Sequence, residues 1–413
     1  MAAVTQAPAV HTSTFAALRY ANYRLYFAGQ LVSLSGSWMQ VVAQGWLVFH
    51  LTRSELWLGI VAAAAGLPSI VISPFAGVLI DRFSRRAILL ATQIFLMALA
   101  AVMAALTFSG TVQVWHVVAL AALGGLANAV DAPARQAFVR DMVGRDHITS
   151  GVALNSMMFN SARIVGPTIA GLALASVGAG WCFFINAVSF LAAIVALLLM
   201  HLEGAPAPSV KGVPPLTALR DGVRYSRQHG AIGPLLLLSS VTCLFAVNIV
   251  SVLPAFAAVT LRSPVEGYST LSTAQGIGAV LGALTLAFAG RTFGRGHVVS
   301  AMVLLIMAAA LGLATTTAVL PAALCMTALG FSVVMFFVNI NTLIQDQVPD
   351  EYRGRVLSLY TLTFLGFSPI GSLALGALAN HIGTPPAIAL YGALNGALGV
   401  LVLLRWRALW RLP

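Results

Sequence analysis

The sequence predicts an all-α membrane protein with twelve transmembrane helices arranged as two six-helix halves. Of its 413 residues, 59% are hydrophobic and only 8% are charged, whereas a soluble protein carries about 25% charged residues. The apolar residues form long continuous runs, and roughly 20 such residues cross a bilayer as one helix. The two halves of the chain also resemble each other in sequence.

Each predicted helix is an apolar run bounded by turn residues such as Ser109-Gly110 and Pro349-Asp350. Only helices and closed barrels satisfy all backbone polar groups in lipid, and long runs without alternation favour helices. The predicted helices cover 22–50, 56–80, 86–108, 114–135, 148–177, 181–202, 232–260, 267–290, 297–317, 320–345, 354–380 and 384–405.

The basic residues predict the orientation of the chain in the membrane. All of the 22 Lys and Arg residues except Arg53, Arg163 and Arg262 fall on one side of the predicted helices. Because basic loops stay in the cytoplasm, both termini are predicted to be cytoplasmic, as an even number of spans requires. The expected location is the inner (cytoplasmic) membrane of a bacterium. This topology accounts for the net charge of +11 without a nucleic-acid partner.

A polar stretch at 203–231 divides the chain into an N-terminal bundle (1–202, with 1–18 as a cytoplasmic tail) and a C-terminal bundle (232–413). This stretch is predicted to be a linker with a surface helix, or else a regulatory or partner-binding element. The segments VRDMVGRDHITSGVALNSMMFNSARIVGPTIAG and IQDQVPDEYRGRVLSLYTLTFLGFSPIGSLALG align at a constant offset of 205. Such a repeat predicts a pseudo-two-fold axis along the membrane normal and a site between the halves.

The loop after the second predicted helix reads GVLIDRFSRR. It resembles the signature loop of the major facilitator superfamily, except that Ser84 replaces the usual glycine. The matching residues are Gly77, Asp81, Arg82, Arg85 and Arg86. The resemblance implies that Asp81 holds a helix N-terminus, or a basic partner such as Arg135 or Arg140, in one state and releases it in the other. Alternatively, these charges serve only the membrane topology.

The fifth predicted helix resembles that of the exporting branches of this superfamily, which carries small residues and ends in Gly-Pro-x-x-Gly-Gly. The matching positions are Ala153, Ala162, Gly166, Pro167, Ala170 and Gly171. Small residues let two helices approach closely, and a proline permits a bend. The resemblance implies a close-packed, bendable contact between the halves, with ordinary helix packing as the alternative.

The first predicted helix, the signature loop and LRDGVRYSRQHG are similar to the branch that includes the enterobactin exporter and macrolide and drug efflux pumps. The resemblance implies a monomeric exporter of a small amphipathic molecule, siderophore- or drug-like, that works by alternating access in exchange for protons. An importer of the same fold and a lipid-handling protein are the alternatives. The chain has no Walker motif, and its eight histidines are scattered. Neither an enzyme nor a cofactor is therefore expected.

Polar residues inside the spans are candidates for the substrate cavity. Arg163 stands near the middle of its predicted helix, where an arginine costs about 3 kcal/mol to insert. It is expected to contact an anionic substrate group or a coupling acid, to make structural bonds, or to lie nearer a membrane edge. Polar residues at helical spacing on the first helix are expected to line the cavity or to bond neighbouring helices. The cavity candidates are Arg163, Asn160, Gln30, Ser37, Gln40, Gln44, Trp38, Asn248, Tyr360 and Phe364.

Asp131 is the only acidic residue expected within a span, near the cytoplasmic end of the fourth helix. Exchange for protons requires a titratable group that both sides of the membrane can reach. Asp131 is therefore the candidate proton carrier, and Asp81 is the next. A structural ion pair with Arg135, one helical turn later, is the alternative role for Asp131.

Overall fold

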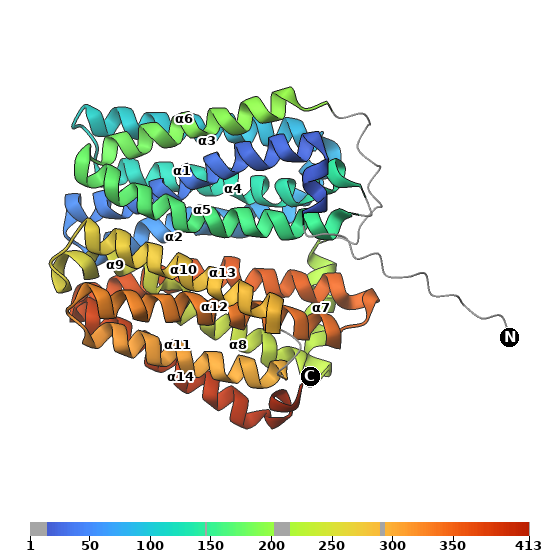
Figure 1. The fold of residues 1–413 in the computed structure, drawn as a ribbon. Helices are drawn as coiled ribbons and strands as arrows, with labels where there is room; N and C mark the ends of the chain where they lie inside the picture. Colours follow the sequence, from blue (N-terminus) through green and yellow to red (C-terminus); the bar gives the residue numbers. More distant parts are fainter. Residues whose placement is uncertain (1–14, 145–146, 202–214, 290–293, 413) are drawn as a thin grey trace.

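The computed structural model describes residues 15–144, 147–201, 215–289 and 294–412. Most of the predicted tail and the first part of the predicted linker lie outside these ranges. Every regular element of the described chain is a helix. Figure 1 shows two stacked bundles, α1 to α6 and α8 to α14. The helix α7 lies at the end of the molecule where the C-terminus is drawn.

The N-terminal bundle contains α1 Ala21–Thr52, α2 Glu55–Arg82, α3 Arg85–Phe108, α4 Val114–Val143, α5 Ile148–Ser176 and α6 Ala179–Leu199. The linker helix α7 covers Pro215–Gln228. The C-terminal bundle contains α8 Ile232–Phe245, α10 Glu266–Ala289, α11 Arg295–Thr315, α12 Val319–Gln347, α13 Asp350–Ile382 and α14 Thr384–Arg405. The helix α4 continues past its predicted end at residue 135, because hydropathy marks the lipid-buried part of a helix rather than its full length.

The predicted helical span 232–260 is confirmed as one membrane-length segment, Ile232–Thr260, but it is not α-helical throughout. After α8 the chain forms a 3₁₀ helix η3 (Val247–Val252), a short α9 (Leu253–Ala255) and a π-helical turn η4 (Phe256–Thr260). The side-chain amide of Asn248 donates to the carbonyls of Cys243 (2.6 Å) and Leu244 (3.0 Å). It thus competes with the backbone for these acceptors, while Pro254 supplies no N–H.

Ten helical segments in the described part of the chain are long and apolar enough to cross a membrane. The helices α1 and α5 are not among them, because polar side chains such as Gln40 and Arg163 lower their mean hydropathy. The total of twelve spans therefore remains a prediction. The cytoplasmic location of both termini also remains a prediction.

Large apolar side chains face outward along the bundles. On α6, Leu191, Val195 and Leu198 are 46%, 49% and 57% exposed, at a spacing that places them on one helix face. Soluble proteins rarely expose such stripes, whereas lipid covers them at no cost. The chain is a multi-pass membrane protein.

The two halves meet along two seams, α2 with α13 and α5 with α10. In the first seam, a Cβ atom placed on Gly59 would lie 2.6 Å from the carbonyl oxygen of Ser372. Beside it, the hydroxyl of Ser54 donates to the side-chain oxygen of Asn380 (2.8 Å). These contacts lie at the start of α2 and the end of α13, which is the end of the bundle away from α7 (Figure 1).

Equivalent glycines of the sequence repeat make equivalent contacts. Gly166 of α5 packs on α1, and Gly371 of α13 packs on α8, so each of these glycines contacts the first helix of its own half. Gly171 of α5 meets Ser269 of α10, and Gly376 of α13 meets the start of α2. The second glycine of each pair therefore contacts the second helix of the opposite half, as a pseudo-two-fold relation requires.

Replacing Gly59 by Val is expected to disfavour this closed arrangement of the halves. The added side chain would meet backbone atoms of α13, and overpacking of this kind costs about 1–3 kcal/mol. The measurement is the yield of a disulfide between Ser54→Cys and Asn380→Cys, which should fall several-fold. The matched control is Gly77→Val on the same helix, because a Cβ there meets nothing within 4 Å. Equal yields in the two variants would contradict the proposed steric role of the seam.

Candidate functional site: a polar cavity between the halves

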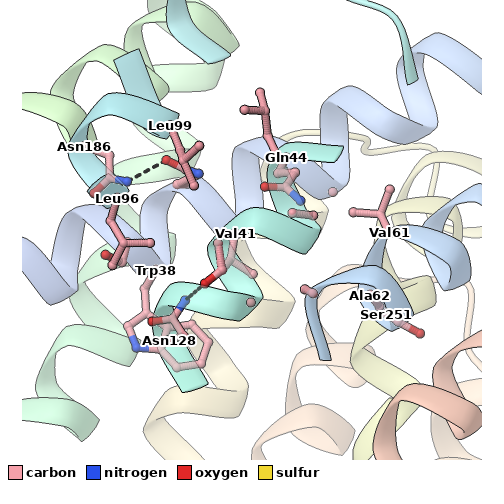
Figure 2. Close-up of a pocket in the computed structure, with 18 of the residues that line it drawn as sticks. Trp38, Val41, Gln44, Val61, Ala62, Leu96, Leu99, Asn128, Asn186 and Ser251 are labelled. Atoms are coloured by element: carbon pink, nitrogen blue, oxygen red, sulfur yellow. Dashed lines mark hydrogen bonds between the residues drawn. The ribbon is translucent and has the colours of Figure 1, made fainter. Parts of the chain in front are cut away.

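A cavity of about 550 Å³ lies between the two bundles. Its volume is within the range of pockets that hold small organic molecules. Figure 2 shows part of its lining, including Trp38, Gln44, Asn128 and Asn186 from the N-terminal half and Ser251 from the C-terminal half.

The polar stripe of α1 forms one wall of this cavity. Of the residues predicted for the cavity or for coupling, the lining includes Ser37, Trp38, Gln40, Gln44, Asn248 and Asp131. Ser37, Gln40 and Gln44 are three or four residues apart, and this spacing places them on one face of α1. The α1 wall therefore combines hydrogen-bonding groups with the ring of Trp38.

Further polar residues of the lining stand alone in mostly apolar helices, so the sequence did not predict them as cavity residues. Sequence reasoning missed Gln93, Asn186, Ser251, Tyr268, Ser368 and Ser372 as members of this site. A single polar residue in an apolar span was the only available signal. Asn186, for example, donates to the side-chain oxygen of Gln40 (2.6 Å) and so fixes part of the α1 wall from α6.

Asp131 is fully buried and is the only acid on the cavity lining that the structure describes. One carboxylate oxygen accepts hydrogen bonds from Thr92 (2.7 Å) and Gln93 (3.0 Å) of α3. The other oxygen lies 2.8 Å from Nε of Arg135, in an ion pair without an aligned hydrogen bond. A buried carboxylate needs such partners, because an isolated charge is very costly in a low-dielectric interior.

Arg135 connects this acid to α1. Its Nη1 donates to the side-chain oxygen of Gln30 at 3.5 Å, and the hydroxyl of Ser33 donates to the side-chain oxygen of Gln93 at 3.3 Å. Gln30 is buried and does not line the cavity, and its amide nitrogen has no hydrogen-bond partner in the described chain. The network therefore connects Asp131 to two helices, α1 and α3, beside the cavity.

Asn248 organises the opposite wall from the C-terminal half. Its side-chain oxygen accepts from the hydroxyls of Ser368 (2.9 Å) and Ser372 (2.8 Å) of α13, while its amide bonds the end of α8. Ser368 is the repeat counterpart of Arg163. The two halves thus use different chemistry at equivalent positions, a charged residue in one and a neutral network in the other.

Arg163 lies beside the cavity and does not belong to its lining. Its guanidinium carbon is 5.4 Å from the ring centre of Trp38, which is on the lining. Its Nε is buried without a hydrogen-bond partner among the residues described. The sequence left open a bond between Arg163 and carbonyls freed by Pro167, and no such bond is present in the described chain. Instead, the freed carbonyl of Arg163 itself faces Gly276 of α10, with a distance of 2.8 Å to a Cβ placed there.

The other predicted cavity residues lie away from the described lining. Tyr360 is buried and its hydroxyl donates to the carbonyl of Phe337 (2.9 Å). Phe364 packs on that same Phe337, with ring centres 4.2 Å apart. Asn160 donates to the carbonyl of Ser156 on its own helix. These side chains serve packing and local bonding in this conformation.

The small residues of α5 pack against two neighbouring helices, α1 and α10. Ala162 and Ala170 are buried, Gly166 packs on α1, and the carbonyl of Pro167 accepts from the hydroxyl of Ser269 on α10 (2.7 Å). Ala153 is exposed. The second part of the motif, with Pro167 and Gly171, contacts the opposite half.

The signature loop forms pairs within its own half. Arg85 pairs with Asp141 at the end of α4, and Arg86 donates to the carbonyl of Leu198 (2.9 Å). The side chain of Asp81 lies outside the described part, and Arg82 is exposed. Arg135, predicted as a partner for this loop, pairs with Asp131.

Two arginines near the cavity are expected to respond differently to replacement by Met. Removing Arg135 leaves the buried carboxylate of Asp131 without its partner, which should lower the free energy of unfolding by about 3–5 kcal/mol. The only described side-chain interaction of the Arg163 guanidinium is the cation–π contact with Trp38. Removing Arg163 should therefore change the free energy of unfolding by about 1 kcal/mol or less. Thermal unfolding in detergent measures both, and a larger loss for Arg163→Met would contradict this assignment.

Comparison with known proteins places this architecture in a family. The family model of transmembrane secretion effectors matches residues 12–410. The chain is 24% identical to the staphyloferrin A transporter of Staphylococcus aureus, over 89% of this chain and 92% of that one. It is 29% identical to the multidrug efflux pump Tap of Mycolicibacterium fortuitum, over 86% and 88%. It is 26% identical to macrolide efflux protein A of Streptococcus pyogenes, over 91% and 95%.

Solved structures share the fold at low sequence identity. A mutant of the peptide transporter POT aligns with a TM-score of 0.77 at 12% identity, over 94% of this chain and 95% of that one. A D-xylose-proton symporter aligns with a TM-score of 0.70 at 15% identity, over 94% and 97%. The protein is thus a transporter rather than an enzyme, and the chain belongs to the transmembrane secretion effector family of the major facilitator superfamily.

Proposed function

We propose that this protein exports a small amphipathic molecule, siderophore- or drug-like, across the bacterial inner membrane in exchange for protons. The observation that carries the proposal is the cavity between the halves, where a buried acid–arginine pair lies beside polar and aromatic side chains. The similarity to a staphyloferrin A transporter and to two efflux proteins supports this class of substrate, and the two efflux proteins support export.

The proposed orientation has twelve spans and cytoplasmic termini, with a single chain as the functional unit. The distribution of basic residues supports it. In that orientation the contacts of Ser54 and Gly59 with α13 close the outer side. The described conformation would then be the one that loads substrate from the cytoplasm, and export would require α2 and α5 to separate from their partners at the outer end.

Asp131 is the proposed site of proton coupling. Its carboxylate lies on the cavity lining and is held by Arg135, Thr92 and Gln93. Protonation would remove the negative charge and release Arg135 from the ion pair. Gln93 also accepts a hydrogen bond from Ser33 of α1. Protonation of Asp131 would therefore alter the hydrogen bonds that reach α1, the helix that lines the cavity.

The sign of coupling depends on which member of the pair the substrate contacts. If Asp131 is protonated before the substrate binds, a cationic or hydrogen-bond-donating group at Asp131 would favour the ionised carboxylate, so its binding would release a proton, as exchange requires. An anionic group at Arg135 would break the ion pair and favour protonation, so its binding would take up a proton, as cotransport requires. The exchange proposal therefore predicts that a donor group of the substrate contacts Asp131.

Arg163 is proposed to serve the substrate through Trp38, whose ring it faces at 5.4 Å. Fixing that ring would shape an aromatic surface for a bulky ligand. The second candidate function is import by the same fold, and a lipid-handling role is the third. The names of the relatives favour export over both.

Uptake into energised inside-out vesicles tests the proposed function. Respiration should drive accumulation of staphyloferrin A or of a macrolide, and a protonophore should abolish it. Arg163→Met should lower this uptake while leaving the amount of folded protein unchanged. Uptake by right-side-out vesicles only would instead establish import, and accumulation that the protonophore does not affect would exclude protons as the coupling ion.

Asp131→Asn is expected to abolish proton coupling, because the amide keeps the shape of the carboxyl group and carries no titratable proton. Substrate added to the purified wild-type protein in weak buffer, at a pH low enough for Asp131 to be protonated beforehand, should release protons, which a pH indicator detects. Asp131→Asn should release none and should lose most of the driven accumulation. The control is Asp141→Asn, since Asp141 pairs with Arg85 and is not on the cavity lining. Proton release by Asp131→Asn equal to that of the wild type would remove Asp131 from the mechanism.

A further inference from the structure

A second hollow, of about 310 Å³, lies where the linker helix α7 meets α8 and α13. We call it the linker groove. Its lining is Val223, Ser226, Arg227, Gly233, Leu236, Leu359, Leu362, Thr363 and Phe367. Most of these residues are apolar, so the groove suits a hydrocarbon chain.

The polar residues of the linker groove leave one group free to bind a ligand. The hydroxyl of Ser226 donates to the carbonyl of Gly222 (2.8 Å), and that of Thr363 donates to the carbonyl of Tyr360 (2.7 Å). Arg227 is exposed and has no hydrogen bond or ion pair to any described residue. A guanidinium recognises a phosphate through paired N–H donors. The linker groove thus has an apolar lining with one cation, Arg227, that has no partner among the described residues.

The α7 helix is held firmly enough to present this groove. Asp221 pairs with Arg355 of α13 at 3.2 Å, and the ring of Tyr225 stacks on that of Tyr352 with centres 4.4 Å apart. Gly222 packs directly against α13, with the carbonyl of Arg355 3.0 Å from a Cβ placed there. These contacts use the acid of α7 and leave its arginines available.

The position of the linker groove matches the depth of phospholipid head groups. Gly233 and Leu236 belong to the first turns of the membrane span 232–260. The charged helix α7 lies outside that span, at the end of the bundle (Figure 1). Arg227 is therefore at the boundary between water and hydrocarbon, with the apolar lining toward the hydrocarbon.

We propose that the linker groove binds an anionic phospholipid, with one acyl chain along Leu236, Leu359 and Leu362 and the phosphate on Arg227. The charge of the head group complements Arg227, which is the arginine of α7 on the groove lining and has no carboxylate partner in the described chain. A bound lipid of this kind would tie the linker helix to the C-terminal bundle. This inference depends on the membrane location and not on the transported substrate.

Native mass spectrometry of the full-length protein tests the site, with phosphatidylglycerol and phosphatidylcholine of identical acyl chains as probes. Wild-type protein should retain phosphatidylglycerol more strongly. Arg227→Gln should weaken its binding about fivefold and leave phosphatidylcholine unchanged, because one basic residue near an anionic head group contributes on the order of that factor. Arg224→Gln is the matched control, since Arg224 is exposed on the same helix but does not line the groove.

A second variant separates a groove from a charged surface. Leu362→Trp should fill the trough and reduce binding of both lipids, with thermal unfolding used to verify that the variant is folded. Equal losses in Arg227→Gln and Arg224→Gln would show general attraction to charge and overturn the proposal. Displacement of the lipid by millimolar inorganic phosphate would show a free-anion site and would also overturn it, as would unchanged binding in folded Leu362→Trp.

Discussion

Close approach of helix backbones in the two seams is the contact on which the rest of this structure depends. Where α2 meets α13 and α5 meets α10, glycines and prolines replace larger side chains, so the halves touch backbone to backbone. Lipid chains are as apolar as leucine, and helices in a membrane associate through such packing and through hydrogen bonds. The seams therefore hold the halves together and enclose the cavity between them.

Proline has a specific role in both seams. Pro167 cannot donate to the carbonyl of Arg163, and α10 approaches that carbonyl with Gly276, where a side chain would not fit. In the other seam the ring of Pro369 packs against Gly66 of α2. One helix of each seam, α5 or α13, thus places a proline at its contact with the opposite half. Both seams combine a weakened helix with a small-residue contact, which is a construction suited to movement between two packed states.

The polar groups of the cavity follow from the same physical setting. In a membrane interior each polar side chain needs a partner or a wet surface. Asp131, Gln93, Asn186 and Asn248 find partners on neighbouring helices while facing the cavity. Their networks tie α1 to α3 and α6, and η3 to α13. A change in the charge of Asp131 would therefore act on the packing of several helices, which distinguishes this pair from a local ion pair at a surface.

Sequence alone determined the helical membrane class, the ends of most spans, the internal repeat and the family, because lipid imposes long apolar runs that hydropathy records directly. It also indicated the α1 wall and Asp131, since a stripe or a charge in an apolar span stands out. Tertiary structure decided the rest. In the structure, Arg163, Tyr360 and Phe364 do not belong to the described cavity lining, whereas Gln93 and Asn186 do. The direction in which a single polar side chain faces depends on which helices surround it. Tertiary structure also broke the segment after α8, since the bonds of Asn248 to Ser368 and Ser372 join residues far apart in the chain.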